Sequence, residues 1–358
     1  MVKKRVLLAL SGGVDSSVCA HLLRLQNYEI TGVTFLIYHD NSRLKHLQRG
    51  LNDALIIAEK LNIPHFIIDL KKEFKNEVIQ YFLDSYLNGL TPNPCVHCNP
   101  LIKWNTLLNL ADEFDCEFIA TGHYAKTVHL NGQYYLGLPA DSTKDQTYFL
   151  WKLNQDQIKR TIFPLSDMKK DDVKKLAHGL GFEHISKKKE SYNICFIPDG
   201  NYREYIESNP GLKNNSKFNG EFVTENDEKA GEYHGIWNFT IGQHFGKVLS
   251  PGTKLYIMSI NAEKAKITIG PKEKLYKKTA ILKSYQLPLN LDKGHKLRLK
   301  VKYSYRSPFE ECDISVFEDA LKAEFINPVY GLAPGQSIVF YSDNLLLGGG
   351  IIYETLEC

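Results

Sequence analysis

A short stretch near the N-terminus combines glycines, hydroxyls and one carboxylate in an order suited to binding phosphate. It runs from Leu10 to Ser17 as Leu-Ser-Gly-Gly-Val-Asp-Ser-Ser and follows an apolar run that begins at Val6. Glycines let a turn approach a ligand closely, and the amides that begin a following helix form an anion site. The Gly-Lys-Ser/Thr ending of the Walker loop is missing, so we do not expect γ-phosphate transfer. The alternative is a glycine-rich turn that binds no ligand.

Cysteines are the second set of residues that could do chemistry. Cys95 and Cys98 form a Cys-x-x-Cys pair, and Cys195 stands far along the chain. Such thiols serve as nucleophiles or metal ligands. No second Cys-x-x-Cys pair completes a structural zinc site. Taken alone, Cys195 is more typical of a small residue buried in a core.

The elements that must position these residues alternate between strand and helix over the first 125 or so residues. Apolar runs predict strands at 6–10, 29–38, 65–69 and 117–121. Helical spacing lies between them, at 17–25, around 54–61 and at 74–87. This order predicts a parallel sheet covered by helices on both faces.

Two stretches interrupt this pattern. Residues 89–103 hold three prolines and predict a loop. Residues 126–138 carry Asn131-Gly132 between apolar segments, which predicts a β-hairpin. Helical spacing returns over 155–181, and short strands take over from about Gly200.

One C-terminal segment is strongly basic. Residues 277–306 hold nine Lys or Arg and a single acid, Asp292, a balance of +8. Residues 296–303 alternate basic and apolar side chains, so a strand there has one basic and one buried face. Such a face could meet RNA phosphates, and binding would then weaken steeply with salt. The alternative is a solvated face that protects a sheet edge.

Composition excludes several classes of protein. The chain has 358 residues, 43% of them hydrophobic, and a net charge of +3. It lacks an apolar run of ~18 residues and a signal-peptide core, so we expect a cytoplasmic protein with no membrane partner. Its seven cysteines are odd in number and sparse, unlike a secreted disulfide framework.

Taken together, these segments resemble the tRNA-specific 2-thiouridylases, the MnmA/TrmU family within the PP-loop ATP pyrophosphatases. The resemblance covers nearly the whole chain. The matching segments are 11–16, 91–99 with Lys103, 121–125, 144–149, 194–197, 240–243, 334–336 and 347–350.

The resemblance implies that the protein uses ATP with Mg²⁺ and cleaves it between the α- and β-phosphates. Asp15 would help to hold the magnesium ion, while Phe35 and Gly122 would border the adenine. The implied nucleotide site consists of Ala9, Leu10, Ser11, Gly12, Gly13, Val14, Asp15, Ser16, Phe35 and Gly122.

It also implies a tRNA-uridine 2-sulfurtransferase that acts on the wobble position, uridine 34. ATP would adenylate the C2 oxygen of the base, and a persulfide on Cys195 would then deliver sulfur. Cys98 would be the partner nucleophile, which releases the sulfur or forms a disulfide with Cys195. Both roles need thiolates, so we expect lowered thiol pKa values. His97 and Lys103 could supply the positive field, or they could be solvated loop residues.

Cys95 departs from the family pattern, because some members have Asp at this position. Cys95, Cys98 and Cys195 together could hold an iron–sulfur cluster with one iron left open. Sulfur transfer that depends on such a cluster is the less favoured alternative to the persulfide route.

The implied partners are tRNA and a sulfur-donor protein, with the enzyme itself a monomer. Asn93, Pro94 and Cys95 would contact the target base, which must leave its stack. The other implied RNA contacts are His123, Lys144, Asp145, Gln146, Tyr305, Arg306 and Gln336. For Cys195 to approach Cys98, we expect the polar segment before Cys195 to be mobile without RNA.

The expected fold is α/β. It comprises a parallel-sheet PP-loop domain (adenine nucleotide alpha hydrolase-like) over 1–200, a small central β-rich domain over 201–275 and a C-terminal tRNA-binding β-barrel over 276–358. Two rival functions stay open. One is another PP-loop ligase, which would not need Cys98 and Cys195, and the other is an RNA-binding protein with an inactive ATP site.

Overall fold

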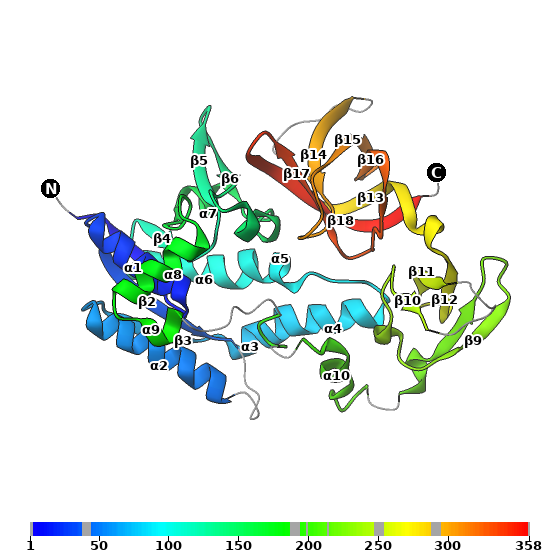
Figure 1. Ribbon diagram of the computed structural model, residues 1–358, viewed down its shortest axis with the longest axis horizontal. Coiled ribbons are helices and arrows are strands. Elements are labelled where there is room, and N and C mark those ends of the chain that lie inside the picture. The colour runs from blue at the N-terminus through cyan, green and yellow to red at the C-terminus, as the bar shows by residue number, and fades with distance from the viewer. Residues whose placement is uncertain are drawn as a thin grey trace. The chain divides into compact units, whose positions relative to one another are not determined.

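The computed structural model describes residues 3–37, 44–186, 194–197, 200–212, 215–246, 254–287 and 295–356, traced in Figure 1. The chain divides into two compact units, neither of which is one continuous stretch. The first holds Met1–Val78, Cys95–Tyr192 and Asn344–Leu346. The second holds Ile79–Pro94, Asn193–Asp343 and Leu347–Cys358. Most of the segment that we expect to be mobile, 187–193, lies outside the described residues.

A five-stranded parallel sheet forms the centre of the first unit, which confirms the predicted parallel α/β fold. The strand order is β3-β2-β1-β4-β7. Val6, Leu7 and Leu8 of the central strand are fully buried, which explains its unbroken apolar run. The strands are β1 Arg5–Ala9, β2 Glu29–Leu36, β3 His65–Asp69, β4 Phe118–Ala120 and β7 Thr161–Ile162.

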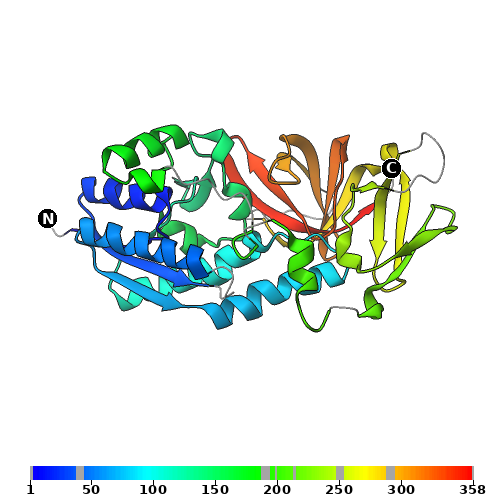
Figure 2. The same cartoon turned by 60° about the horizontal axis from the view of Figure 1, so that its bottom comes forward.

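Helices cover this sheet on both faces (Figure 2). Val6 and Leu8 share a core with α1 (Val14–Leu25), α2 (Leu44–Lys60), α8 (Lys170–Gly179) and α9 (Glu183–Ser186). Leu7 points the other way along the strand and is equally buried, and α6 (Asn105–Glu113) contacts β1 and β4.

Two predictions of local structure are wrong. Residues 89–103 are not a continuous loop, because α5 (Pro94–Cys98) and the π-helical segment η2 (Asn99–Trp104) lead into α6. Proline is tolerated in a first helical turn, where its missing amide would have no partner. Residues 155–181 are not wholly helical either, since β7 lies between α7 (Gln155–Lys159) and α8.

The predicted hairpin is confirmed. β5 (Lys126–Leu130) pairs with β6 (Gln133–Gly137), and Asn131 and Gly132 take φ values of 50° and 78° between them. A two-residue hairpin loop with a type I′ turn requires positive φ at both of its central residues. Leu345 and Leu346 extend the pairing from β6. The remaining short helices of this unit are α3 Lys71–Phe74, η1 Lys75–Ile79 (its last residue in the second unit), η3 Ser142–Lys144 and η4 Thr147–Phe149.

In the second unit, α4 (Gln80–Leu87) packs against α10 (Tyr202–Glu207) through aromatic rings. Tyr86 stacks on Tyr202 at 4.7 Å, and Phe82 meets Phe196 edge-on at 5.3 Å. A five-stranded sheet follows in the order β10-β11-β12-β8-β9. Its strands are β8 Gly220–Val223, β9 Lys229–Tyr233, β10 His244–Phe245, β11 Leu255–Asn261 and β12 Lys266–Pro271, with the short helices η5 Ser216–Phe218, η6 Ile236–Asn238 and η7 Lys272–Leu275 nearby.

The C-terminal strands close into the predicted β-barrel. They run in the order β13-β16-β15-β14-β17-β18, and β13 also pairs with β18. The barrel core includes Leu299, Val301, Ile314, Phe325 and Phe340. The strands are β13 Tyr276–Gln286, β14 Lys296–Lys302, β15 Glu310–Phe317, β16 Ala320–Tyr330, β17 Ser337–Ser342 and β18 Leu345–Leu356.

β14 carries the basic alternation, and burial along it follows the predicted period of two. Leu299 and Val301 face the barrel core, while Lys296, Arg298 and Lys300 are exposed. The edge-protection alternative is wrong, because β14 pairs with β15 on one side and β17 on the other.

Candidate functional site

The phosphate loop leaves the carboxyl end of β1 and enters α1, the place where parallel sheets bind ligands. Within it, the hydroxyls of Ser16 and Ser17 donate to the carbonyl of Gly13 at 3.1 and 2.7 Å. The Ser11 amide in turn donates to Ser16 Oγ at 3.2 Å. These bonds fix the loop shape. Since Gly13 at the start of α1 has no side chain to cap the helix, the first helical amides can serve a bound anion.

Gly12 is required by the packing of this loop against α2. Its φ is +71°, and a Cβ there would lie 2.0 Å from the carbonyl oxygen of Gly50. Any side chain would therefore force the loop and helix apart. Ala9, Leu10 and Val14, the other predicted nucleotide residues, are backbone neighbours in this same turn.

Asp15 lies in the first turn of α1 and is held by two donors from other elements. The ammonium of Lys170 lies 2.6 Å from each carboxylate oxygen, and the hydroxyl of Tyr124 donates at 2.9 Å. Burial and the Asp15 charge raise the pKa of Tyr124, so it stays protonated. The sequence did not point to Lys170, because its partner lies 155 residues away and no local motif marks it.

Gly122 packs directly against this helix turn. A Cβ at Gly122 would lie 3.1 Å from both Asp15 Cβ and the Ser16 amide nitrogen. Phe35, half-buried near the end of β2, is the other residue that we expect to border the adenine.

His123 is held in its neutral form. Burial and the charge of Lys103 lower its pKa to about 3. Its Nδ1 lies 3.0 Å from Thr121 Oγ1, and its ring lies 5.2 Å from that of Trp104. Any contact that it makes with tRNA is therefore a neutral hydrogen bond rather than an ion pair.

Asp145 and Gln146, two predicted RNA contacts, have intramolecular partners. Asp145 is buried and accepts from the amide and hydroxyl of Thr147 at 2.9 and 2.6 Å. Gln146 Oε1 accepts from the Tyr124 amide at 2.9 Å. The structure thus uses both side chains to hold the turn around Lys144 in place.

Cys95 and Cys98 share the short helix α5. Burial raises the pKa of the Cys98 thiol to about 11, against an opposing effect of Lys103. The pKa of Cys95 is also raised by burial, again opposed by Lys103. The prediction that the pKa of Cys98 is lowered is therefore wrong.

The two suggested sources of positive field behave differently. Lys103 lowers both thiol pKa values, which favours the first of its two alternatives, but it lowers them less than burial raises them. His97 has its own pKa lowered, first by burial and then by Lys152, so it is neutral at physiological pH. Of these two residues, Lys103 therefore supplies positive charge to Cys95 and Cys98, and His97 does not.

Cys195 is exposed, so the core-residue interpretation is wrong. The residues after it, Phe196 and Ile197, are buried instead. Phe196 fixes the segment by packing on Phe82 and on Tyr205 at 5.5 Å. The exposed thiol of Cys195 is therefore attached directly to two buried residues that hold its backbone in place.

Asn93 and Pro94 belong to the segment that begins at Thr91 in the second unit, while Cys95 belongs to the first. Gln336 Nε2 donates to the Thr91 carbonyl at 3.0 Å, and the Thr91 amide donates to the Pro334 carbonyl at 2.8 Å. Gln336, which we predict to contact RNA, therefore holds the segment that leads to the cysteines.

Tyr305 and Arg306 lie in the turn between β14 and β15, with Arg306 exposed. The neighbouring basic face is less positive than its sequence suggests. Arg298 forms a bidentate ion pair with Asp313 at 2.8 and 3.0 Å, and Lys296 lies 2.7 Å from Glu324. Acids from β15 and β16 therefore balance part of the +8 segment.

Metal and disulfide sites are absent from the part of the chain that is described. No group of three or more His, Cys, Asp or Glu side chains there is arranged to hold a metal ion, and no disulfide joins its cysteines. Among those residues, no helix is long and apolar enough to span a membrane.

Models of three domain families match the chain. They are the tRNA methyl transferase HUP domain over residues 4–199, the tRNA methyl transferase PRC-barrel domain over 212–271 and the Aminomethyltransferase beta-barrel domain over 277–352.

Full-length relatives match as well. The tRNA-specific 2-thiouridylase MnmA 2 of Clostridium botulinum (strain Hall) is 39% identical over 356 residues, covering 99% of each chain. The tRNA-specific 2-thiouridylase MnmA of Cytophaga hutchinsonii is 38% identical over 369 aligned positions, again covering 99% of each. A solved structure, the U34-tRNA thiolase NcsA from Methanococcus maripaludis with its 4Fe–4S cluster, matches with a TM-score of 0.37 and 23% identity over 58% of this chain and 67% of that one. By its family model and its full-length relatives, this chain belongs to the tRNA-specific 2-thiouridylase (MnmA) family.

Proposed function

We propose that this protein is an ATP-dependent tRNA-uridine 2-sulfurtransferase that acts on the wobble uridine. The observation that carries the proposal is the Ser11–Ser17 loop at the end of β1, with its helix amides and the Asp15 carboxylate. Family membership supplies the substrate class, because the relatives are named as tRNA-specific 2-thiouridylases.

In the first step, the C2 oxygen of uridine attacks the α-phosphate of ATP, and pyrophosphate leaves. The loop amides would bind the phosphates without needing a Walker lysine. A lone carboxylate such as Asp15 suits Mg²⁺, which is usually held by one or two carboxylates plus phosphate oxygens and water. The ion would neutralise charge on the phosphates.

In the second step, the terminal sulfur of a Cys195 persulfide attacks C2 and expels AMP. The Cys98 thiolate then attacks Cys195 Sγ, and the sulfur–sulfur bond breaks with its electron pair going to the sulfur on C2. This leaves 2-thiouridine and a Cys98–Cys195 disulfide, which an external thiol reductant would reopen. The exposure of Cys195 supports its role as acceptor of sulfur from a donor protein. The raised pKa of Cys98 means that it must lose a proton before it attacks.

The direct test is to incubate the protein with unmodified tRNA, ATP, Mg²⁺ and a persulfide donor, whose transferable sulfur is already at the oxidation level of the Cys195 persulfide, and then to analyse nucleosides by mass spectrometry. We expect 2-thiouridine at position 34. Cys98→Ser and Cys195→Ser should abolish it while pyrophosphate release continues, and Cys116→Ser serves as a control outside the site. Thiolation that persists in both serine variants would overturn the cysteine roles. A ligase would instead stay fully active in them.

Cluster-dependent transfer is the second candidate, and one observation favours it. Cys95 and Cys98, two of the three suggested ligands, lie one helical turn apart on the short helix α5. Anaerobic purification with iron and sulfide analysis tests this route. Full thiolation by rigorously iron-free protein would rule it out.

A further inference from the structure

Lys170 is a buried cation in direct contact with the phosphate loop. Its side chain is 8% exposed, and its ammonium pairs with both oxygens of Asp15. It also lies 5.6 Å from the ring of Tyr124, which binds the same carboxylate. Burying a charge costs free energy unless the charge is paired, so a buried lysine at this position is better explained by a binding role than by solubility.

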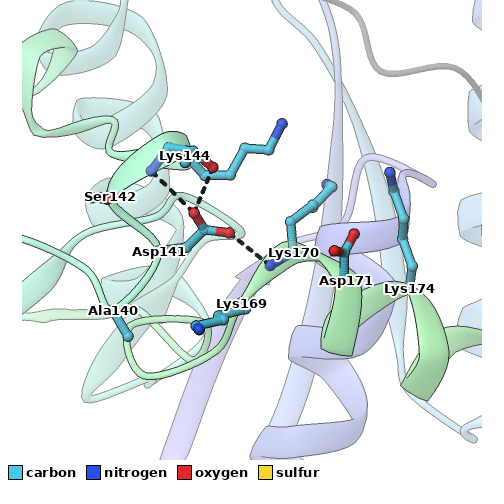
Figure 3. A pocket seen from close by; sticks show the side chains of 9 residues that line it. Ala140, Asp141, Ser142, Lys144, Lys169, Lys170, Asp171 and Lys174 are labelled. Atoms are coloured by element: carbon cyan, nitrogen blue, oxygen red, sulfur yellow. Dashed lines mark hydrogen bonds between the residues drawn. The ribbon is translucent and has the colours of Figure 1, made fainter.

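The same lysine borders a cavity of about 600 Å³ in the first unit. Figure 3 shows the side chains of Lys144, Lys170 and Lys174 extending toward the same side. Four lysines and two aspartates line this space together with Ala140, Ser142 and Thr143; the charged residues are Lys144, Lys169, Lys170, Lys174, Asp141 and Asp171. The balance of +2 favours an anionic occupant.

The cavity wall is fixed by Asp141. One of its oxygens accepts from the Lys170 amide at 2.9 Å. The other accepts from the amide and hydroxyl of Thr143 at 3.0 and 2.6 Å. This carboxylate joins the start of α8 to the turn that carries Lys144, so two of the lysines are held at a set spacing.

Resting on the proposed function, we propose that Lys170 and this cavity bind the β- and γ-phosphates of ATP and then the pyrophosphate that leaves. Lys170 exchanges the Asp15 carboxylate for phosphate oxygens, which carry more negative charge. The exchange leaves Asp15 held by Tyr124 and open to the magnesium ion bound with ATP. Lys170 thus takes the part that a lysine within the loop plays in Walker sites.

Calorimetry on the full chain tests this assignment, with ATP, pyrophosphate and AMP as separate probes in the presence of Mg²⁺. Lys170→Met should weaken binding of ATP and pyrophosphate roughly tenfold or more, while AMP binding changes by less than about twofold. Lys170→Arg should recover part of the loss. Lys175→Met is the matched control, because Lys175 lies on α8 and pairs with Asp172 at 3.3 Å, outside this cavity.

The outcomes separate the alternatives. Equal losses of affinity for ATP and AMP in Lys170→Met would mean that Lys170 only stabilises the structure of the loop. Unchanged pyrophosphate binding would overturn the assignment of the cavity to the phosphates. A variant that loses tRNA affinity but keeps ATP affinity would reassign the cavity to RNA phosphates. Should Lys170→Met fail to fold, Lys174→Gln must weaken pyrophosphate binding roughly threefold or the proposal falls. Wild-type protein that binds ATP and pyrophosphate but forms no 2-thiouridine would overturn the proposed function and leave this assignment standing.

Discussion

The side-chain amide of Gln336 donates a hydrogen bond of 3.0 Å to the backbone carbonyl of Thr91. Pro334 accepts from the amide of the same threonine, so the residue is held from both sides. Gly335 between them has a φ of +93°, and a Cβ there would lie 3.0 Å from the Thr91 backbone. Residues 334–336 therefore hold Thr91 in place, and with it the start of the segment that leads to Cys95 and Cys98. We call this contact the Thr91 clamp.

Gln336→Ala should separate clamping from RNA binding. Loss of the bond should cost about 1 kcal/mol of unfolding free energy and lower the rate of thiolation. If clamping is its main role, tRNA affinity should change by less than about twofold. Urea denaturation and a tRNA filter-binding assay measure the two effects. A tRNA affinity that falls tenfold with unchanged stability would make Gln336 chiefly an RNA contact.

The reactivity of Cys98 should depend on pH and on Lys103. With a pKa of about 11, only about one Cys98 thiol in 10⁴ is ionised at pH 7, so alkylation should be slow and should rise about tenfold per pH unit. Because Lys103 lowers that pKa, Lys103→Met should slow alkylation further. Iodoacetamide labelling with peptide mass analysis follows this cysteine alone. Fast labelling at pH 7 would show that the thiol is not buried as described.

His123 should make the fold sensitive to acid. Its folded pKa of about 3 lies below the ordinary value of 6.5, so the unfolded chain binds the extra proton as the pH falls below 6.5. Stability should therefore be lost on acidification, by about 1.5 kcal/mol between pH 6.5 and 5 from this residue. His123→Gln should show a correspondingly smaller loss in urea titrations. Parallel pH curves for the two proteins would contradict the lowered pKa of His123.

Two arginines of the barrel offer a matched test of tRNA binding. Arg306 is exposed in the turn after β14, whereas the charge of Arg298 is balanced by Asp313. Arg306→Gln should weaken tRNA binding and reduce the salt slope by about one, and Arg298→Gln should change it little. Affinities measured across a range of salt concentrations give both slopes. Wild-type slopes in both variants would mean that neither arginine contacts a phosphate, and an equal reduction in both would mean that each of them does.

Features set by neighbouring residues could be predicted from the sequence. The β1–α1 loop, the Asn131-Gly132 hairpin and the alternation on β14 each follow from local spacing. β7 could not be predicted, because it is two residues long and exists by pairing with β4.

The site depends more on contacts between distant parts of the chain. Lys170 contacts Asp15 from 155 residues away, and Gln336 contacts Thr91 from 245 residues away. Neither contact produces a pattern that can be recognised in the local sequence. The pKa of Cys98 follows from burial, which its polar neighbours in the sequence do not reveal. Ion pairs with β15 and β16 likewise balance part of the charge of β14, which looks uniformly basic in its own sequence.

The interleaving of the two units has a consequence for synthesis on the ribosome. Phe82 and Tyr86 of α4 emerge early, but their partners Phe196 and Tyr202 come more than 100 residues later. At 5–20 residues per second, this aromatic face waits roughly 5 to 25 s without its native packing. The nascent chain would then expose this face to chaperones, and a chain cut near residue 200 would separate Tyr86 from Tyr202.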